Sequence, residues 1–206
     1  MSKKKIHLFL DLDNTIINAL TPDEIDEIHK KGFKPEKYFE HYDFKINNKL
    51  FYRIYERPNL QIFLDLIFEL FDISVFTAAN NDYASFITKN IIEKNNRKVN
   101  YIFYSMHSEI TVRYLHGLKD LNLLWKIYNL PNIKKENTLI LDDNPDVYEC
   151  NKYNCIRTPN FHIIDEENFS INTNSINDTF LLKEAPKILL NIYKYFNKHK
   201  TIKIKQ

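Results

Sequence analysis

In the stretch LFLDLDNTI, residues 8–16, two aspartates follow an unbroken apolar run. Short apolar runs bounded by turn-forming residues are typical of strands buried on both faces of a parallel sheet. A carboxylate rarely lies next to a core unless it is paired or binds a cation. Asp11 and Asp13 are therefore either surface-turn residues, which aspartate favours, or members of a functional site.

Two further apolar runs end in polar residues in the same way. Residues 73–76 end at Thr77, and residues 139–141 end at the adjacent acids Asp142 and Asp143. Each run has the length and the β-branched content of a buried strand. If the strands are parallel, these polar residues follow their carboxyl ends, which is where open α/β sheets bind ligands. The sequence thus predicts that they lie together with Asp11 and Asp13.

Helical patterns separate the apolar runs and fix the fold class. They cover residues 57–72, with Asn59 as the expected N-cap, and residues 80–94 and 119–130. Strands that alternate with helices predict an α/β protein with a Rossmann-like parallel sheet flanked by helices. We expect a single domain over residues 1–206 with small β insertions near the active site.

Three segments depart from this alternation. Residues 41–58 predict a hairpin, because Asn47-Asn48 can adopt the positive φ angles of a tight turn. Residues 98–116 are interpreted as an inserted β segment, with short strands at 101–104 and 111–115. Residues 179–200 predict a C-terminal helical segment with a break or restart at Pro186.

Composition narrows the possible functions. With 206 residues and 44% apolar residues, the chain can form a real core, and its formal charge of +2 gives no reason to expect nucleic acid as a partner. The chain has only two glycines, too few for a phosphate-binding P-loop or a dinucleotide-binding fingerprint. The two cysteines, Cys150 and Cys155, lack the spacing of a zinc site and are expected to be free thiols. Without a secretory signal or an apolar span, a cytoplasmic or nuclear location and no membrane partner are expected.

The polar residues at the strand ends suit phosphoryl transfer. Mg²⁺ prefers oxygen ligands, which Asp11 and one acid of the Asp142/Asp143 pair can supply, with Asp13 adding its backbone carbonyl. The alternative for Asp142 and Asp143 is to cap the following turn. Thr77 can donate a hydrogen bond to phosphoryl oxygens, although it could simply end a strand. Lys119 can supply a compact positive charge, although a lone lysine is more often solvated.

The same residues define a mechanism. An aspartate with an ordinary pKa of about 3.9 is ionised at neutral pH and can attack phosphorus without a base, which makes Asp11 the candidate nucleophile. A serine alkoxide leaves poorly unless it is protonated, and Asp13 is close enough in sequence to act as the general acid. Asp13 can then activate the water that hydrolyses the aspartyl-phosphate.

Four motifs resemble those of the haloacid dehalogenase-like phosphatases: DLDNT, SVFTAANNDYA, LKDL and LILDDNP. ERPNLQIFL together with VFTAANNDYA resembles, more narrowly, the phosphatases of the RNA polymerase II C-terminal domain (CTD). The resemblance covers about residues 5–165. It implies the roles derived above, with Asp11 as the nucleophile and Asp13 as the acid and base. Thr77 and Lys119 would bind the phosphate, and the Asp142/Asp143 pair would hold Mg²⁺ together with Asp11 and Asp13.

The resemblance also implies substrate-binding roles for Arg57 and Tyr83. Tyr83, with Tyr104 and Tyr114, could line a pocket for a proline or apolar side chain, or could equally belong to the core. The chain departs from the family at Asn14, where glutamate is usual. It departs again around His107, where an arginine is common, and Arg113 is the residue that could compensate.

The expected function is an Mg²⁺-dependent protein serine/threonine phosphatase, a hydrolase of phosphoric monoesters. By resemblance, its leading substrate is the C-terminal tail of RNA polymerase II, and any substrate would be a phosphoprotein or phosphopeptide. Two alternatives stay open. One is a small-molecule or phosphotyrosine phosphatase of the same superfamily. The other is a non-catalytic phosphopeptide-binding adaptor, although the retention of both Asp11 and Asp13 argues against it.

Overall fold

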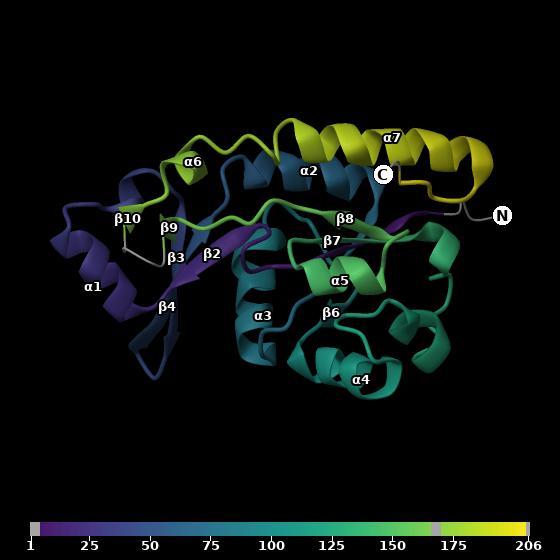
Figure 1. Cartoon of the computed structure of the whole chain (residues 1–206), viewed down its shortest axis with the longest axis horizontal. Coiled ribbons are helices and arrows are strands. Elements are labelled where there is room, and N and C mark those ends of the chain that lie inside the picture. The colour runs from purple at the N-terminus through teal and green to yellow at the C-terminus, as the bar shows by residue number, and fades with distance from the viewer. Residues whose placement is uncertain (1–4, 166–169, 205–206) are drawn as a thin grey trace.

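A five-stranded parallel sheet lies at the centre of the protein, whose computed structural model describes residues 5–165 and 170–204 (Figure 1). The strand order is β6-β5-β1-β7-β8, so β1 is central. The strands are β1 (His7–Leu10), β5 (Asp72–Phe76), β6 (Ile102–Phe103), β7 (Thr138–Asp142) and β8 (Cys155–Arg157). The α/β fold and the parallel sheet predicted from the sequence are confirmed.

Helices cover both faces of this sheet, which explains why its central strands carry apolar residues on both faces. Alternate residues of a strand point to opposite faces. Leu8 and Leu10 of β1 pack in the cluster that includes α2 (Leu60–Leu70), α3 (Asn81–Ile87) and α7 (Glu184–His199). Phe9 packs on the other side, in the cluster that includes residues of α4 (Ser105–Leu115) and α5 (Pro145–Cys150). Figure 1 shows α2 and α7 side by side above the sheet.

Two small antiparallel sheets extend from this core. The larger has the order β2-β4-β3 and comprises β2 (Ile17–Leu20), β3 (His41–Ile46) and β4 (Lys49–Glu56). The predicted hairpin is confirmed, because Asn47 and Asn48 turn between β3 and β4 with φ angles of 50° and 62°. The smaller sheet pairs β9 (Ile164–Asp165) with β10 (Ser170–Ile171). Figure 1 shows both sheets at one end of the molecule, near α1 (Pro22–Lys30) and α6 (Thr173–Ile176).

The prediction of an inserted β segment at 98–116 is wrong. β6 joins the main sheet beside β5, and the expected strand at 111–115 lies within α4. The buried residues His107, Ser108 and Thr111 follow helical spacing, and the Tyr104 backbone amide donates to His107 Nδ1 at 3.1 Å at the start of the helix. Burial of this face outweighs the strand preference of Thr111 and Val112. The segment therefore continues the alternation of strand and helix.

Other helices are shorter than the sequence predicts. The expected helix at 119–130 contains only a short π-helix at Leu123–Ile127, and α3 continues into a second π-helix at Thr88–Ile92. Two 3₁₀ turns lie at Pro35–Lys37 and Lys135–Asn137.

Asn59 precedes α2 in a left-handed conformation without capping it through its side chain. In the C-terminal segment, the helix begins at Glu184, so Pro186 falls in its first turn, where no amide hydrogen is needed.

Within the described ranges, no helix has the length and apolar character needed to cross a membrane.

Candidate active site

The parallel register brings the polar strand ends to one edge of the sheet. Leu10 is level with Val75 on β5 and with Leu141 on β7. The residues that follow these strands therefore meet at the same edge, and the Asp11 amide donates to the Leu141 carbonyl at 3.0 Å. The structure confirms the predicted gathering at the carboxyl ends of the strands.

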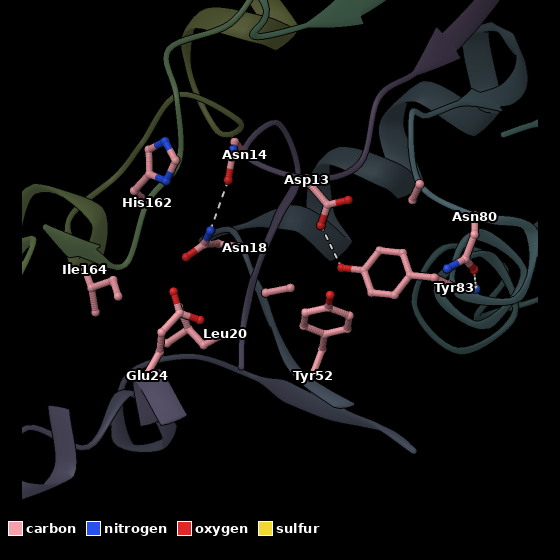
Figure 2. Close-up of a pocket in the computed structure, with 12 residues that line it drawn as sticks. Asp13, Asn14, Asn18, Leu20, Glu24, Tyr52, Asn80, Tyr83, His162 and Ile164 are labelled. Atoms are coloured by element: carbon pink, nitrogen blue, oxygen red, sulfur yellow. Dashed lines mark hydrogen bonds between the residues drawn. The ribbon is translucent and has the colours of Figure 1, made fainter. Parts of the chain in front are cut away.

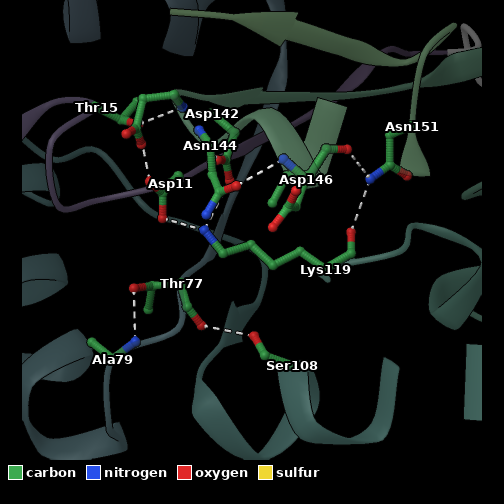
Figure 3. A network of polar contacts seen from close by, with 12 residues as sticks. Asp11, Thr15, Thr77, Ala79, Ser108, Lys119, Asp142, Asn144, Asp146 and Asn151 are labelled. Carbon is green, nitrogen blue, oxygen red and sulfur yellow. Dashed lines mark hydrogen bonds and ion pairs between the residues drawn. The ribbon is translucent and has the colours of Figure 1, made fainter. Parts of the chain in front are cut away.

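A buried lysine joins two of the acids at this edge. Lys119 Nζ lies 2.5 Å from Asp11 Oδ1 and 2.8 Å from Asp142 Oδ2, as Figure 3 shows. Burial alone would lower the Lys119 pKa, but the two carboxylates outweigh it and hold that pKa above its ordinary value. Burial and the charge of Asp11 raise the Asp142 pKa, against the opposing effect of Lys119. Lys119 thus stays charged and partly neutralises the acids.

The backbone of Lys119 is held in an unusual conformation. Its φ angle is 48°, in the left-handed region, which costs a residue with a Cβ about 1–2 kcal/mol. Asn151 Nδ2 donates to the Lys119 carbonyl at 3.2 Å, and Asn151 Oδ1 accepts from the Leu121 amide at 3.0 Å. Asn151 therefore positions the loop that carries the lysine. Sequence reasoning did not find it, because a buried asparagine has no motif.

Thr15 connects Asp11 to Asp143 through its hydroxyl. Its hydroxyl lies 2.9 Å from Asp11 Oδ2 and 2.9 Å from Asp143 Oδ1, and it accepts from the Asp143 amide at 3.1 Å. It is fully buried. Sequence reasoning also missed this residue, although its position as the last residue of the DLDNT motif was a usable signal.

Three carboxylates form a group that fits a divalent cation. Asp11, Asp142 and Asp143 offer oxygens within 4.8 Å of one another, the one such group among the residues that the structure describes. Oxygen donors of this kind suit Mg²⁺. The Asp13 side chain is not in this group, and it accepts a hydrogen bond from Tyr83. A metal role for Asp13 therefore depends on its backbone carbonyl.

Asp13 and Tyr83 form a second pair. The Tyr83 hydroxyl donates to Asp13 Oδ1 at 2.6 Å (Figure 2). Burial raises the Asp13 pKa to about 6, the Tyr83 hydrogen bond opposes this, and the charge of Asp11 adds to the rise. A carboxyl group with such a pKa can both give and take a proton near neutral pH.

Thr77 lies on the same edge as these acids. Its hydroxyl accepts from the Ala79 amide at 3.1 Å, and its carbonyl accepts from the Ser108 hydroxyl at 3.4 Å. Figure 3 shows Thr77 on the side of Asp11 and Lys119 away from Thr15. Because the Thr77 hydroxyl accepts a hydrogen bond from the protein, its own hydrogen can point to a phosphoryl oxygen.

Arg57 is not placed to contact a substrate. Its side chain has 0% exposure, and it donates to the carbonyls of Thr15 and Pro159 and to the carboxylate of Asp178. These partners occupy the guanidinium inside the protein. The expectation of a substrate-binding Arg57 is therefore wrong, and Arg57 instead holds the loop that carries Thr15.

The residues around α4 are divided between core and surface. The His107 ring stacks on Phe103, with centroids 4.7 Å apart, and meets Tyr104 edge-on at 4.6 Å. Tyr114 is 61% exposed, and the Arg113 guanidinium lies 5.4 Å from its ring centroid. Of the three tyrosines considered for a pocket, only Tyr83 lines the cavity beside Asp13.

That cavity has a volume of about 390 Å³. Its walls include Asp13, Asn14 and Tyr83 (Figure 2). Asn14 adopts a φ of 60°, a left-handed conformation that asparagine tolerates, and its side-chain oxygen accepts from Asn18 at 3.0 Å.

The fold and the site together define a class of protein, the haloacid dehalogenase-like phosphatases, which the sequence motifs resemble. Comparison with known families gives the narrower assignment. The chain matches the NLI interacting factor-like phosphatase family over residues 6–186, and it belongs to that family. It is therefore a phosphatase, in a family that implies a divalent metal.

Its relatives carry names of the same kind. It is 37% identical over 166 residues to the CTD phosphatase-like protein 355R of Invertebrate iridescent virus 6, covering 78% of this chain and 88% of the relative. It is 35% identical over 192 residues to the protein 355R of Invertebrate iridescent virus 3, covering 88% of this chain and 94% of the relative.

Solved structures of the RNA polymerase II CTD phosphatase Fcp1 share the fold. The fission yeast Fcp1-R271A variant bound to beryllium fluoride superimposes with a TM-score of 0.59 at 20% identity, over 94% of this chain and 52% of that one. A second Fcp1 structure gives a TM-score of 0.56 at 22% identity, over 94% of this chain and 50% of that one. The chain thus spans about half the length of the Fcp1 chains.

Proposed function

We propose that this chain is an Mg²⁺-dependent protein serine/threonine phosphatase that works through an aspartyl-phosphate on Asp11. The observation that supports this most directly is the contact of Lys119 with both Asp11 and Asp142, beside a third acid, Asp143. A dianionic phosphate repels a carboxylate nucleophile unless nearby positive charge offsets the repulsion.

The first half of the reaction transfers the phosphoryl group. An oxygen of Asp11 bonds to phosphorus while the bond to the substrate oxygen breaks. Lys119 and the Thr77 hydroxyl bind the phosphoryl oxygens, and the Asp13 carboxyl gives its proton to the departing oxygen. Asp11, Asp142, Asp143 and the Asp13 carbonyl would hold Mg²⁺, which when bound supplies further positive charge against the phosphate.

The second half regenerates the enzyme. The Asp13 carboxylate takes a proton from water, and the resulting oxygen attacks the phosphorus of the aspartyl-phosphate. Inorganic phosphate leaves, and Asp11 returns as a carboxylate. Tyr83, which donates to Asp13, keeps the carboxyl oriented through both steps.

A phosphoprotein is the substrate class that we propose. The names of the viral relatives and of Fcp1 favour the C-terminal domain of RNA polymerase II as a substrate. A cytoplasmic or nuclear location is part of the same proposal. Selectivity for phosphoserine and phosphothreonine over phosphotyrosine is part of the proposal and is tested with peptides that differ only in the phosphorylated residue.

The test is hydrolysis of an aryl phosphate with and without Mg²⁺, by the wild type and by Asp11→Asn. We expect turnover that requires Mg²⁺ and falls by at least about 10³-fold in the variant. Asp146→Asn is the matched control, because it makes the same change at an exposed aspartate on the neighbouring α5. It should keep wild-type turnover.

Two outcomes would contradict the proposal. Turnover that survives Asp11→Asn would show that another group is the nucleophile. A folded wild-type protein with no turnover, in an assay where active family members score, would favour the non-catalytic adaptor.

A further inference from the structure

We propose that the cavity beside Asp13 is a specificity pocket for the cationic side chain of a lysine or arginine that flanks the phosphorylated residue of a peptide substrate. The inference rests on the proposed phosphatase function and adds to it the chemistry that selects the substrate. It places the selecting charge on Glu24, a residue outside the reaction chemistry.

The position of the cavity limits what can occupy it. Asp13 and Asn14 form part of its wall, and they lie two and three residues after Asp11. A group in the cavity must therefore belong to a residue close to the phosphorylated one. The volume of about 390 Å³ is near the lower end of the range of about 300–1,000 Å³ for ligand pockets, so it suits one side chain.

The charge of the cavity wall favours a cation. Glu24 contributes a carboxylate, and the described residues that line the cavity include one histidine, His162, and no lysine or arginine. The side-chain hydrogen bonds that the structure gives Glu24 all end on Oε2, which accepts from the Thr21 amide and hydroxyl at 2.7 Å each. These bonds hold the carboxylate in place at the start of α1, and Figure 2 shows it directed toward Asn18.

The remaining walls mix polar side chains with apolar ones, such as Leu20 and Ile164, which suits a long basic side chain with an apolar stem and a charged end. Asn14, Asn18 and Asn80 line the cavity, and covering their amide groups with an apolar side chain would cost free energy. The rings of Tyr52 and Tyr83, whose centroids are 5.6 Å apart, offer an aromatic wall. The methylene stem of lysine or arginine can pack on this wall while its charged end reaches Glu24.

Matched phosphoserine peptides test the pocket. Lysine, leucine or glutamate is placed in turn at each of the three positions on either side of the phosphoserine, and kcat/KM is measured. At one position we expect lysine to exceed leucine by about fivefold and glutamate to fall below leucine. The preference should shrink as ionic strength rises, because salt screens exposed charges.

Variants of Glu24 identify the selecting charge. Glu24→Gln should bring the lysine-to-leucine ratio close to one, since glutamine can keep the N-terminal capping interaction with Thr21 while losing the charge. Glu24→Lys should reverse the order, so that the glutamate peptide becomes the best of the three. Asp26→Asn is the control, because it removes a carboxylate from the same helix at an exposed position two residues on, and it should keep the lysine preference.

The outcomes separate this inference from the proposed function. If the wild type hydrolyses an aryl phosphate but treats the lysine and leucine peptides alike at every position, the pocket assignment is overturned and the phosphatase stands. A full lysine preference in Glu24→Gln would overturn the assignment as well. If the wild type hydrolyses no phosphate ester, both fall together.

Discussion

The hydrogen bond from Tyr83 to Asp13 controls the proton that the proposed reaction moves. Burial raises the Asp13 pKa to about 6, and the Tyr83 hydroxyl, 2.6 Å away, limits that rise by stabilising the carboxylate. Without the hydroxyl, burial and the charge of Asp11 act unopposed by this bond. The pKa of Asp13 then rises further.

Tyr83→Phe should therefore shift the pH profile for phosphoserine peptides. Asp13 must be protonated to act as the acid, so kcat/KM falls as pH rises through its pKa. This fall in kcat/KM is the alkaline limb of the pH profile. When the Asp13 pKa is raised, the limb moves to higher pH. Tyr52→Phe, which removes a neighbouring hydroxyl and leaves the Asp13 bond intact, should keep the wild-type limb. An unmoved limb in Tyr83→Phe would show that Asp13 does not set it.

Asp13→Asn should separate substrates by their leaving groups. A serine alkoxide needs a proton as it departs, whereas an aryl oxide leaves without one. Phosphorylation of the enzyme by a phosphoserine peptide should therefore fall by about 10²–10⁴-fold, and by much less with an aryl phosphate. Single-turnover kinetics with both substrates measure the two losses, and equal losses would argue against general-acid catalysis by Asp13.

At the scale of elements, the loop after α4 places the lysine of the site. It begins with His116 in a left-handed conformation, at a φ of 59°, and reaches Lys119 at 48°. A Cβ on Gly117 would lie only 2.7 Å from Cys150 Sγ on α5. A side chain at position 117 would therefore clash with Cys150 on α5.

Gly117→Ala should destabilise the protein by about 1–3 kcal/mol and reduce turnover, because relief of the clash moves the lysine loop. The double variant Gly117→Ala/Cys150→Ala removes the sulfur and should recover a large part of both losses. Denaturant unfolding and aryl phosphate turnover measure them. Strict additivity of the two substitutions would show that the contact carries no coupling.

Strands β1, β5 and β7 were predictable because their signal is local, whereas β2 and β8 were not predicted. Each buried run is apolar on both faces and ends in a polar residue, so the sequence carried both the element and its functional end. The segment at 111–115 was wrongly predicted as a strand because Thr111 and Val112 favour strands. The packing that stabilises α4 comes from residues distant in the sequence. The conformation of Lys119 could not be predicted either, since Asn151, thirty-two residues away, donates a hydrogen bond to its carbonyl.

At the scale of the whole molecule, Arg57 joins three distant segments. Its guanidinium binds the Thr15 carbonyl at 2.8 Å, the Pro159 carbonyl at 2.9 Å and Asp178 at 2.7 Å. The resemblance implied a substrate-binding role for Arg57, and the sequence could not reveal its structural partners, which lie up to 121 residues away. Since Thr15 bonds to Asp11, this buried cation links the active site to the C-terminal segment.

Arg57→Gln should lower the free energy of unfolding by about 3 kcal/mol, because it leaves Asp178 without its charged partner. Asp178→Asn leaves the fully buried Arg57 guanidinium without its counter-charge and should cost about as much. Urea unfolding followed by the fluorescence of Trp125 measures both. A loss below about 1 kcal/mol in Arg57→Gln would contradict a structural role for the arginine.

The proposed mechanism requires that Asp11 becomes covalently phosphorylated, so trapping this species is the first experiment to perform. Asp13→Asn should accumulate the aspartyl-phosphate when it reacts with an aryl phosphate and Mg²⁺, because the base for its hydrolysis is missing. Acid quenching and peptide mass spectrometry should then find one phosphoryl group on the peptide that contains Asp11, and none in Asp11→Asn/Asp13→Asn. A phosphoryl group on another residue, or product release with no phosphorylated enzyme at any time, would show that Asp11 is not the nucleophile.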